Sequence, residues 1–155
     1  MFANMNDVKK ALHALCMAYV DERIATAMQA IQLAQQSAGE ETKSSAGDKY
    51  ETGREMIQQE TNRNMAQLTE ANKLKVALTQ ISAEAPPGPF IQPGSLVITN
   101  NGCFYIAISA GALNYKDETY FAVSIASPIG MQLKGKKANE SFSLNNKVYH
   151  IQYVL

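Results

Sequence analysis

Apolar residues in the first half of the chain recur at alternating steps of three and four positions. This spacing places them on one face of a helix, and alanine makes up much of that face. The rows are Val8, Leu12, Leu15, Tyr19; Ile24, Ala27, Ile31, Ala34, Ala38; and Leu68, Ala71, Leu74, Leu78, Ile81. A narrow face of this kind predicts an antiparallel coiled coil of two helices, over about residues 6–38 and 46–82.

Between the two predicted helices the apolar rhythm stops, and residues 39–53 are rich in glycine, serine and charged residues. Ser44 or Ser45 can cap the start of the second helix, and Ser45, followed three positions later by Asp48, matches the capping pattern. The stretch is therefore predicted to be the tip of the helical hairpin. The charged residues at the tip and next to it are Glu40, Glu41, Lys43, Asp48, Lys49, Glu51 and Arg54.

The second half of the chain has the texture of a small β domain. Residues 84–94 hold four of the five prolines and predict a semi-rigid linker. The strands that follow are expected at residues 95–100, 103–109, 119–126, 140–144 and 148–154. The fold class is thus α+β: a helical hairpin over residues 1–83, the linker, and a five-stranded antiparallel sheet with one short helix over residues 95–155.

Turn and cap residues support these boundaries. The pairs Asn101-Gly102 and Asn145-Asn146 are typical of tight hairpin turns. The short helix is expected to begin with Ser127 as its N-cap and Pro128 at its first position, and to stop at Gly135.

Charge and composition limit the function classes. The 14 basic and 14 acidic side chains cancel, so direct binding to nucleic acid is not expected. Cys16 and Cys103 are far apart in sequence and predict two buried, reduced thiols. His13 and His150 have no nucleophile or carboxylate near them in sequence and are interpreted as structural. With no apolar run long enough for a membrane span, a cytoplasmic protein without a membrane partner is expected.

The carboxy-terminal pattern adds a family resemblance. Ser127-Pro128 before a short helix, the Gly135-Lys136-Lys137 turn, Asn139-Glu140 before a strand, and an alternating last strand resemble the bacterial Gre transcription elongation factors. The resemblance covers about the last 60 residues and extends to the hairpin through its architecture and the sequence DKYETGRE. It implies that the β domain has an FKBP-like fold and docks on RNA polymerase, while the coiled coil enters the secondary channel of the polymerase.

The resemblance also implies roles for particular residues. Acidic residues at the family's tip help to hold a second Mg²⁺ in the polymerase active site, which then cleaves its own backtracked transcript. The candidates for the tip are Glu40, Glu41, Asp48 and Glu51, and those for ligands of the shared Mg²⁺ are Glu40, Asp48 and Glu51. The candidates for docking on the polymerase are Ser127, Pro128 and Ile129.

Two alternatives remain open from the sequence. The family's tip has the pattern Gly-Asp-x-x-Glu-Asn-x-x-Tyr, whereas this tip is longer and includes Lys43 and Lys49, which favours an inhibitor that occupies the channel without delivering metal. The second alternative is an enzyme: an FKBP-like sheet suggests peptidyl-prolyl isomerase activity, which requires a cradle of aromatic residues. The available aromatics are Phe104, Tyr105, Tyr115, Tyr120 and Phe121, and strand alternation separates neighbouring members onto opposite faces. The chain is accordingly expected to act on RNA polymerase rather than as an enzyme itself. No stably bound cofactor is expected, and contact with nucleic acid is expected only through the polymerase.

Overall fold

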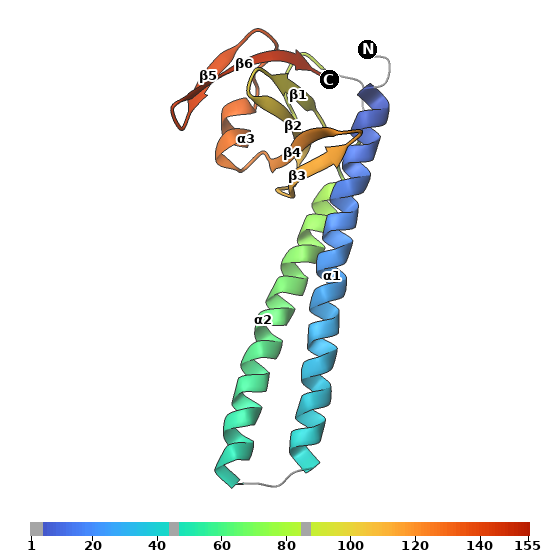
Figure 1. Ribbon diagram of the computed structural model, residues 1–155, viewed down its shortest axis with the longest axis vertical. Helices are drawn as coiled ribbons and strands as arrows, with labels where there is room; N and C mark the ends of the chain where they lie inside the picture. The colour runs from blue at the N-terminus through green and yellow to red at the C-terminus, as the bar shows by residue number, and fades with distance from the viewer. Residues whose placement is uncertain (1–4, 44–46, 85–87) are drawn as a thin grey trace. The chain divides into compact units, whose positions relative to one another are not determined.

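A computed structural model describes residues 5–43, 47–84 and 88–155, with the backbone alone described for the helical residues of 38–52 (Figure 1). The chain divides into two compact units. One comprises Val20–Lys75, and the other combines Met1–Tyr19 with Val76–Leu155. The divisions therefore fall within the two long helices rather than at the predicted linker.

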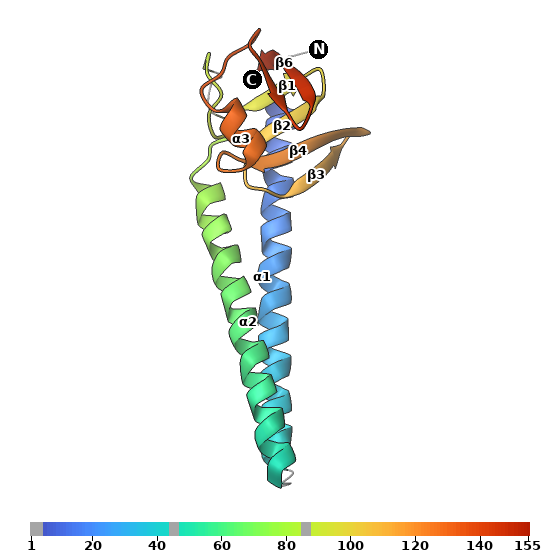
Figure 2. The ribbon, with the colours of Figure 1, turned by 90° about the vertical axis from the view of Figure 1, so that its left-hand side faces the viewer.

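Two long helices supply the whole of the first unit. Helix α1 runs from Met5 to Lys43 and helix α2 from Gly47 to Thr79. Within the unit Val20–Lys75 they run side by side in opposite directions in both views (Figures 1 and 2). Helix α1 continues five residues past the predicted end at residue 38, and the predicted cap at Ser45 lies outside the described residues.

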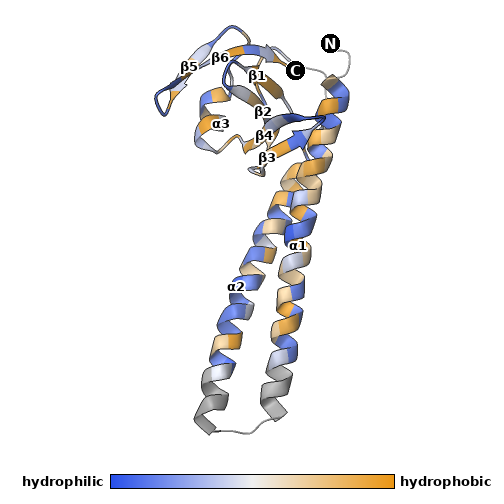
Figure 3. Cartoon of the chain, viewed as in Figure 1, coloured by the Kyte–Doolittle hydropathy of each residue, from blue (hydrophilic) through white to orange (hydrophobic). Residues whose placement is uncertain are grey.

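Small residues form the buried row between these helices. Residues separated by seven positions are buried: Val20, Ala27 and Ala34 on α1, and Asn64 and Ala71 on α2. Residues three or four positions from them are half-buried: Ile24 and Ile31 on α1, and Thr61 and Leu68 on α2. Ile57, seven positions before Asn64, is also half-buried. Figure 3 shows hydrophilic and hydrophobic residues alternating along both helices, as the three-and-four spacing requires. The predicted face is thus confirmed for the described residues of this unit. One cross-helix hydrogen bond joins Lys75 Nζ to an Asp21 carboxylate oxygen at 2.9 Å.

The first turns of α1 depart slightly from the predicted row. Cys16 and Val20 are fully buried there, whereas Leu15 and Tyr19 are only half-buried. The buried positions follow steps of four through Val8, Leu12 and Cys16, which belong to the unit that contains the sheet, and on to Val20, the first residue of the other unit.

The sheet has six strands and is mixed, so the prediction of a five-stranded antiparallel sheet was wrong. Its order is β3-β4-β2-β1-β6-β5, and β2 and β4 are parallel while every other neighbouring pair is antiparallel. The strands are β1 Leu96–Thr99, β2 Gly102–Ala107, β3 Gly111–Tyr115, β4 Glu118–Ser124, β5 Ser141–Leu144 and β6 Lys147–Val154. The strand absent from the prediction was β3, which lies at the edge of the sheet and pairs with β4, while β4 pairs with β2 on its other side.

The turns explain both the successes and this error. Asn145 and Asn146 have φ values of 52° and 65° and join β5 to β6, as predicted for a two-residue hairpin. Lys116 and Asp117 make the same kind of turn between β3 and β4, with φ values of 49° and 64°. Lysine at such a position carries no recognisable turn signal in sequence. The first hairpin turns at Asn100 and Asn101, one position before the predicted pair, and Gly102 starts β2.

The sheet has different partners on its two faces. On one face, helix α3, Pro128–Leu133, adds Leu133 to a core that includes Val97, Phe104 and Ile151. On the other face, Tyr105 meets His13 of α1. Strand alternation sends Phe104 and Tyr105 to these opposite faces, as predicted.

The predicted linker is partly built into the sheet unit. Ile91 is 2% exposed, and its backbone N–H donates to the carbonyl of Lys136 at 2.8 Å. The backbone N–H of Gly94 donates to the carbonyl of Ile106 at 2.7 Å. The later part of this segment is therefore not a free spacer, because Ile91 belongs to the core.

Replacing Ala71 by leucine tests the packing of the two long helices. Ala71 is 1% exposed in the buried row, so the larger side chain should overpack it and lower the free energy of unfolding by about 1 to 3 kcal/mol. Urea unfolding followed by circular dichroism measures the change. Ala66→Leu, at an exposed position of the same helix, is the matched control and should change stability by less than about 0.5 kcal/mol. Equal effects of the two substitutions would contradict this packing.

Candidate functional site

The predicted tip carboxylates lie on helical backbone on both sides of residues 44–46. Glu40 and Glu41 belong to the last turn of α1, and Asp48 and Glu51 to the first turns of α2. A carboxylate in the first turn of a helix is favoured by the free N–H groups there, so Asp48 occupies the best electrostatic position of the four. The side chains of all four lie outside the described residues, as do the predicted Mg²⁺ contacts. Among the residues that are described, no group of three His, Cys, Asp or Glu residues is placed to hold a metal.

The start of α3 has the geometry expected from its sequence. Ser127 is the N-cap, and its hydroxyl oxygen accepts a hydrogen bond from the backbone N–H of Gly130 at 3.0 Å. The same hydroxyl donates to the carbonyl of Ser124 at 2.6 Å. Pro128 occupies the first turn, where its missing N–H costs nothing, and Gly135 follows the helix with a φ of 78°. Ser127 thus ties the beginning of α3 to the end of β4.

Gly130 fixes how closely α3 approaches β4. A Cβ atom at this position would overlap the carbonyl oxygen of Ser124 and lie 2.9 Å from the Cα of Ile125. The neighbouring atoms belong to backbone, which moves much less easily than a flexible side chain. Glycine is therefore required for the close contact, a requirement that sequence reasoning did not identify.

Of the three predicted docking residues, only Pro128 is exposed. The Ser127 hydroxyl is occupied by the cap, and Ile129 is half-buried against the core beneath α3. Met131 is the exposed apolar residue of this helix, with 67% of its surface accessible. The outer surface of α3 is thus formed by Pro128 and Met131, and the second of these was missed.

Both histidines have hydrogen-bond partners, one distant in sequence and one across a hairpin. His13 Nδ1 lies 3.0 Å from the hydroxyl of Tyr105, and the two rings meet edge to face. Burial lowers the pKa of His13 and raises that of Tyr105, so we assign a neutral imidazole that accepts from the tyrosine hydroxyl. On the β5–β6 hairpin, His150 Nδ1 lies 2.9 Å from the hydroxyl of Ser141, the residue with which His150 is paired on β5. The pair His13–Tyr105 leaves no local signal in the sequence, whereas Ser141 and His150 pair through the predicted hairpin turn.

The thiols and aromatic residues divide between core and surface. Cys16 is fully buried, which raises its pKa to about 11, while Cys103 is half-buried. Of the aromatics considered for an isomerase cradle, Tyr115 and Tyr120 line one cavity. Phe104 and Tyr105 are buried on opposite faces of β2, and Phe121 is exposed. The five do not form one pocket.

Comparisons with known proteins identify no relative: no protein-family model, no curated protein and no solved structure matches the chain. Among the described helices, none has a stretch long and apolar enough to cross a lipid bilayer.

The His13–Tyr105 contact predicts a pH dependence of stability. Because burial lowers the pKa of His13 in the folded state, the unfolded chain binds the extra proton first as the pH falls below 6.5. The free energy of unfolding should therefore decrease with falling pH, and His13→Gln should flatten the decrease. Urea unfolding at pH 7.5 and at lower pH measures this. His150→Gln, at the exposed histidine, is the control and should retain the full dependence; identical slopes in all three proteins would exclude the effect.

Gly130→Ala tests the contact between α3 and β4. Relieving the overlap with Ser124 requires a backbone shift, so the free energy of unfolding should fall by about 1 to 3 kcal/mol. Chemical unfolding monitored by tyrosine fluorescence would detect it. Met131→Ala, at an exposed position in the same short helix, should cost less than about 0.5 kcal/mol. An unchanged Gly130→Ala protein would show that α3 can move away from β4 without cost.

Proposed function

We propose that this protein is a Gre-type factor that binds RNA polymerase and inserts its helical hairpin into the secondary channel. The observation that carries the proposal is the start of α3. The Ser127 cap, Pro128, the close contact at Gly130 and the left-handed Gly135 form one packed structure on the sheet. It corresponds to the part of the chain in which the sequence pattern resembles the Gre family.

The turn that precedes the β5–β6 hairpin also supports the proposal of a Gre-type factor. Asn139 has a φ of 75°, the left-handed conformation that glycine supplies in the family pattern. Its backbone N–H donates to the carbonyl of Ile151 at 2.8 Å, and Glu140 follows. The substitution of Gly-Asp by Asn139-Glu140 therefore keeps the turn and its carboxylate. In this proposal the sheet unit is the FKBP-like domain that docks on the polymerase.

The first unit suits the role of an inserted arm. The heptad-spaced burial of alanine and isoleucine between α1 and α2 supports a two-stranded coiled coil with a narrow cross-section. From Val20 to Lys43, α1 alone extends about 35 Å at 1.5 Å per residue. A hairpin of this kind carries the residues of its turn deep into a channel while its other end stays outside.

At the tip, carboxylates would complete a metal site that belongs to the polymerase. A second Mg²⁺ near the first stabilises both the attacking water and the leaving oxygen during hydrolysis of the transcript. Mg²⁺ prefers oxygen ligands and retains several waters, so one or two carboxylates are sufficient. Glu40, Glu41, Asp48 and Glu51 are the candidates, with Glu40, Asp48 and Glu51 proposed as metal ligands. The cleavage activity is the polymerase's own, the Mg²⁺ is shared, and the site of action is the cytoplasm.

A second candidate is a factor that occupies the channel and inhibits the polymerase without stimulating cleavage. The presence of Lys43 and Lys49 among the tip carboxylates favours it, because positive charge opposes Mg²⁺ binding. Both candidates require binding to the polymerase, and cleavage of a backtracked transcript separates them.

Single alanine substitutions of Glu40, Glu41, Asp48 and Glu51 test metal delivery. At least one should slow transcript cleavage by a stalled complex at least about tenfold, because a metal loses a supporting carboxylate. Binding to core RNA polymerase should remain unchanged, as measured by co-purification with the tagged protein.

Two further variants serve as controls. Glu55→Ala, at an exposed position farther along α2, should affect neither property. Met131→Glu places a charge on the outer surface of α3 and should weaken binding and cleavage together. Unchanged cleavage in all four tip variants would exclude metal delivery, and absence of polymerase binding by the unmodified chain would exclude the proposed function.

A further inference from the structure

One face of the sheet carries a row of side chains that do not pack completely. Tyr153 of β6 lies opposite Ile98 of β1, and Ile98 lies opposite Cys103 of β2. Residues paired in this way project from the same face of a sheet. Tyr120 of β4 continues the row, since its neighbour Phe121 pairs with Phe104, the residue after Cys103. The row forms the floor of a cavity of about 440 Å³.

The beginning of α1 and the β3–β4 hairpin complete the walls of this cavity. Met5 and Val8 line it from α1, and Tyr115, Lys116 and Glu118 line it from the hairpin. Every one of these residues belongs to the unit that contains the sheet. The volume lies within the range typical of small-molecule sites, and most of the lining is apolar.

The charged residues of the cavity lining are Glu118 and Lys116. Glu118 accepts a hydrogen bond from the Tyr120 hydroxyl at 3.2 Å. Burial first, and then the charge of Glu118, raise the pKa of Tyr120 to about 12 and also raise the pKa of Cys103. Both groups therefore remain protonated and neutral at pH 7. In the described part of the chain, no lysine, arginine or histidine lies within ion-pair distance of Glu118.

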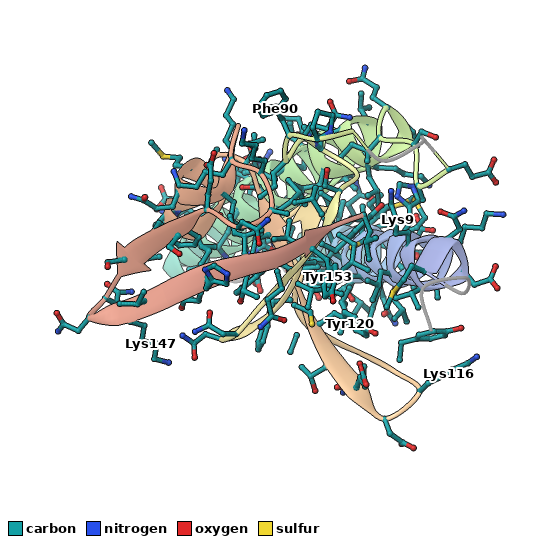
Figure 4. The ribbon with its side chains drawn as sticks, turned by 90° about the horizontal axis from the view of Figure 1, so that it is seen from above. Lys9, Phe90, Lys116, Tyr120, Lys147 and Tyr153 are labelled. Carbon is teal, nitrogen blue, oxygen red and sulfur yellow. The ribbon has the colours of Figure 1, made fainter. Side chains whose placement is uncertain are left out.

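The nearest cation of the hairpin is bound to an aromatic ring. Lys116 Nζ lies 5.4 Å from the centre of the Tyr115 ring. Figure 4 shows Lys116 at the outer tip of the β3–β4 hairpin, whereas Tyr120 and Tyr153 lie near the base of the hairpin. Lys116 thus lines the cavity with its ammonium group held over the Tyr115 ring, whereas the Glu118 carboxylate lies beside the neutral Tyr120 hydroxyl.

We propose that this cavity binds a small apolar amine. Its protonated nitrogen would donate to Glu118, and the tyrosine rings beside the carboxylate would stabilise the positive charge through their faces. Its hydrocarbon body would pack between Val8 and Met5 on one side and Ile98 and Cys103 on the other. This binding does not depend on the proposed action on RNA polymerase.

Three probes with one hydrocarbon body and different charges test the proposal on the full chain. These are 4-phenylbutylamine, 4-phenylbutanol and 4-phenylbutyrate, and isothermal titration calorimetry gives the dissociation constants. The amine should bind most tightly, the alcohol more weakly, and the acid least, because its carboxylate would lie beside Glu118. Equal or tighter binding of the acid, or no binding of the amine at millimolar concentration, would overturn the proposal.

A matched pair of variants locates the charge that recognises the amine. Glu118→Gln keeps the size and the hydrogen-bond acceptor but removes the charge, so affinity for 4-phenylbutylamine should fall about tenfold. Asp117→Asn makes the same charge change one position earlier, outside the lining, where asparagine readily adopts the observed φ of 64°. Its affinity should stay within about twofold of the unmodified chain. Equal losses in both variants would show a general charge effect and overturn the assignment of Glu118.

The two thiols provide an independent readout that requires no substitution. Cys103 lines the cavity and Cys16 is fully buried elsewhere in the same unit. Bound 4-phenylbutylamine should slow the alkylation of Cys103 by iodoacetamide, as followed by peptide mass spectrometry, and should leave Cys16 unaffected. Binding measured by calorimetry without protection of Cys103 would place the amine outside this cavity and contradict the proposal.

Discussion

The close contact between α3 and the end of β4 is the constraint on which the sheet unit depends. Gly130 leaves no room for a Cβ atom beside the Ser124 carbonyl, and the Ser127 hydroxyl bonds that same carbonyl while capping the helix. Because the helix is held this closely, Leu133 reaches the core formed by Val97, Phe104 and Ile151. The outer surface of α3 is consequently presented in one fixed orientation.

The long helices satisfy a different constraint. Their buried row is made mainly of small side chains, which allows two backbones to lie close together and keeps the pair narrow. Asn64 is a polar member of that row at 8% exposure, and every buried polar side-chain atom in the described residues has a partner. A buried amide disfavours shifted pairings of the helices, in which it would lie against alanine. A narrow arm with one register suits insertion better than a wide and strongly apolar bundle would.

Sequence periodicity predicted the features that depend on local pattern. The three-and-four spacing identified the buried positions from Ile24 to Ala34, and the Ser127, Pro128 and Gly135 signals identified α3, because burial and capping are set within a few residues. The parallel pairing of β2 with β4 was missed, since the turn at Lys116 and Asp117 has neither the glycine nor the asparagine that marks most two-residue turns. The His13–Tyr105 contact and the cavity beside Glu118 join residues from distant parts of the chain, and such contacts leave no local signal. For the tip, the helical backbone is described on both sides of the turn, but the side chains of the predicted ligands are not.

The central claim is that the turn between α1 and α2 reaches the catalytic metal of RNA polymerase. Fe²⁺ can replace the Mg²⁺ at that centre and, with peroxide, generates hydroxyl radicals that cut nearby polypeptide. Mapping the cuts in the end-labelled protein bound to such a polymerase measures proximity directly, whether the outcome is cleavage or inhibition. The account predicts cuts confined to about residues 39–53, around Glu40, Glu41, Asp48 and Glu51. Cuts in the sheet unit alone, or none in a complex shown to be bound, would contradict it.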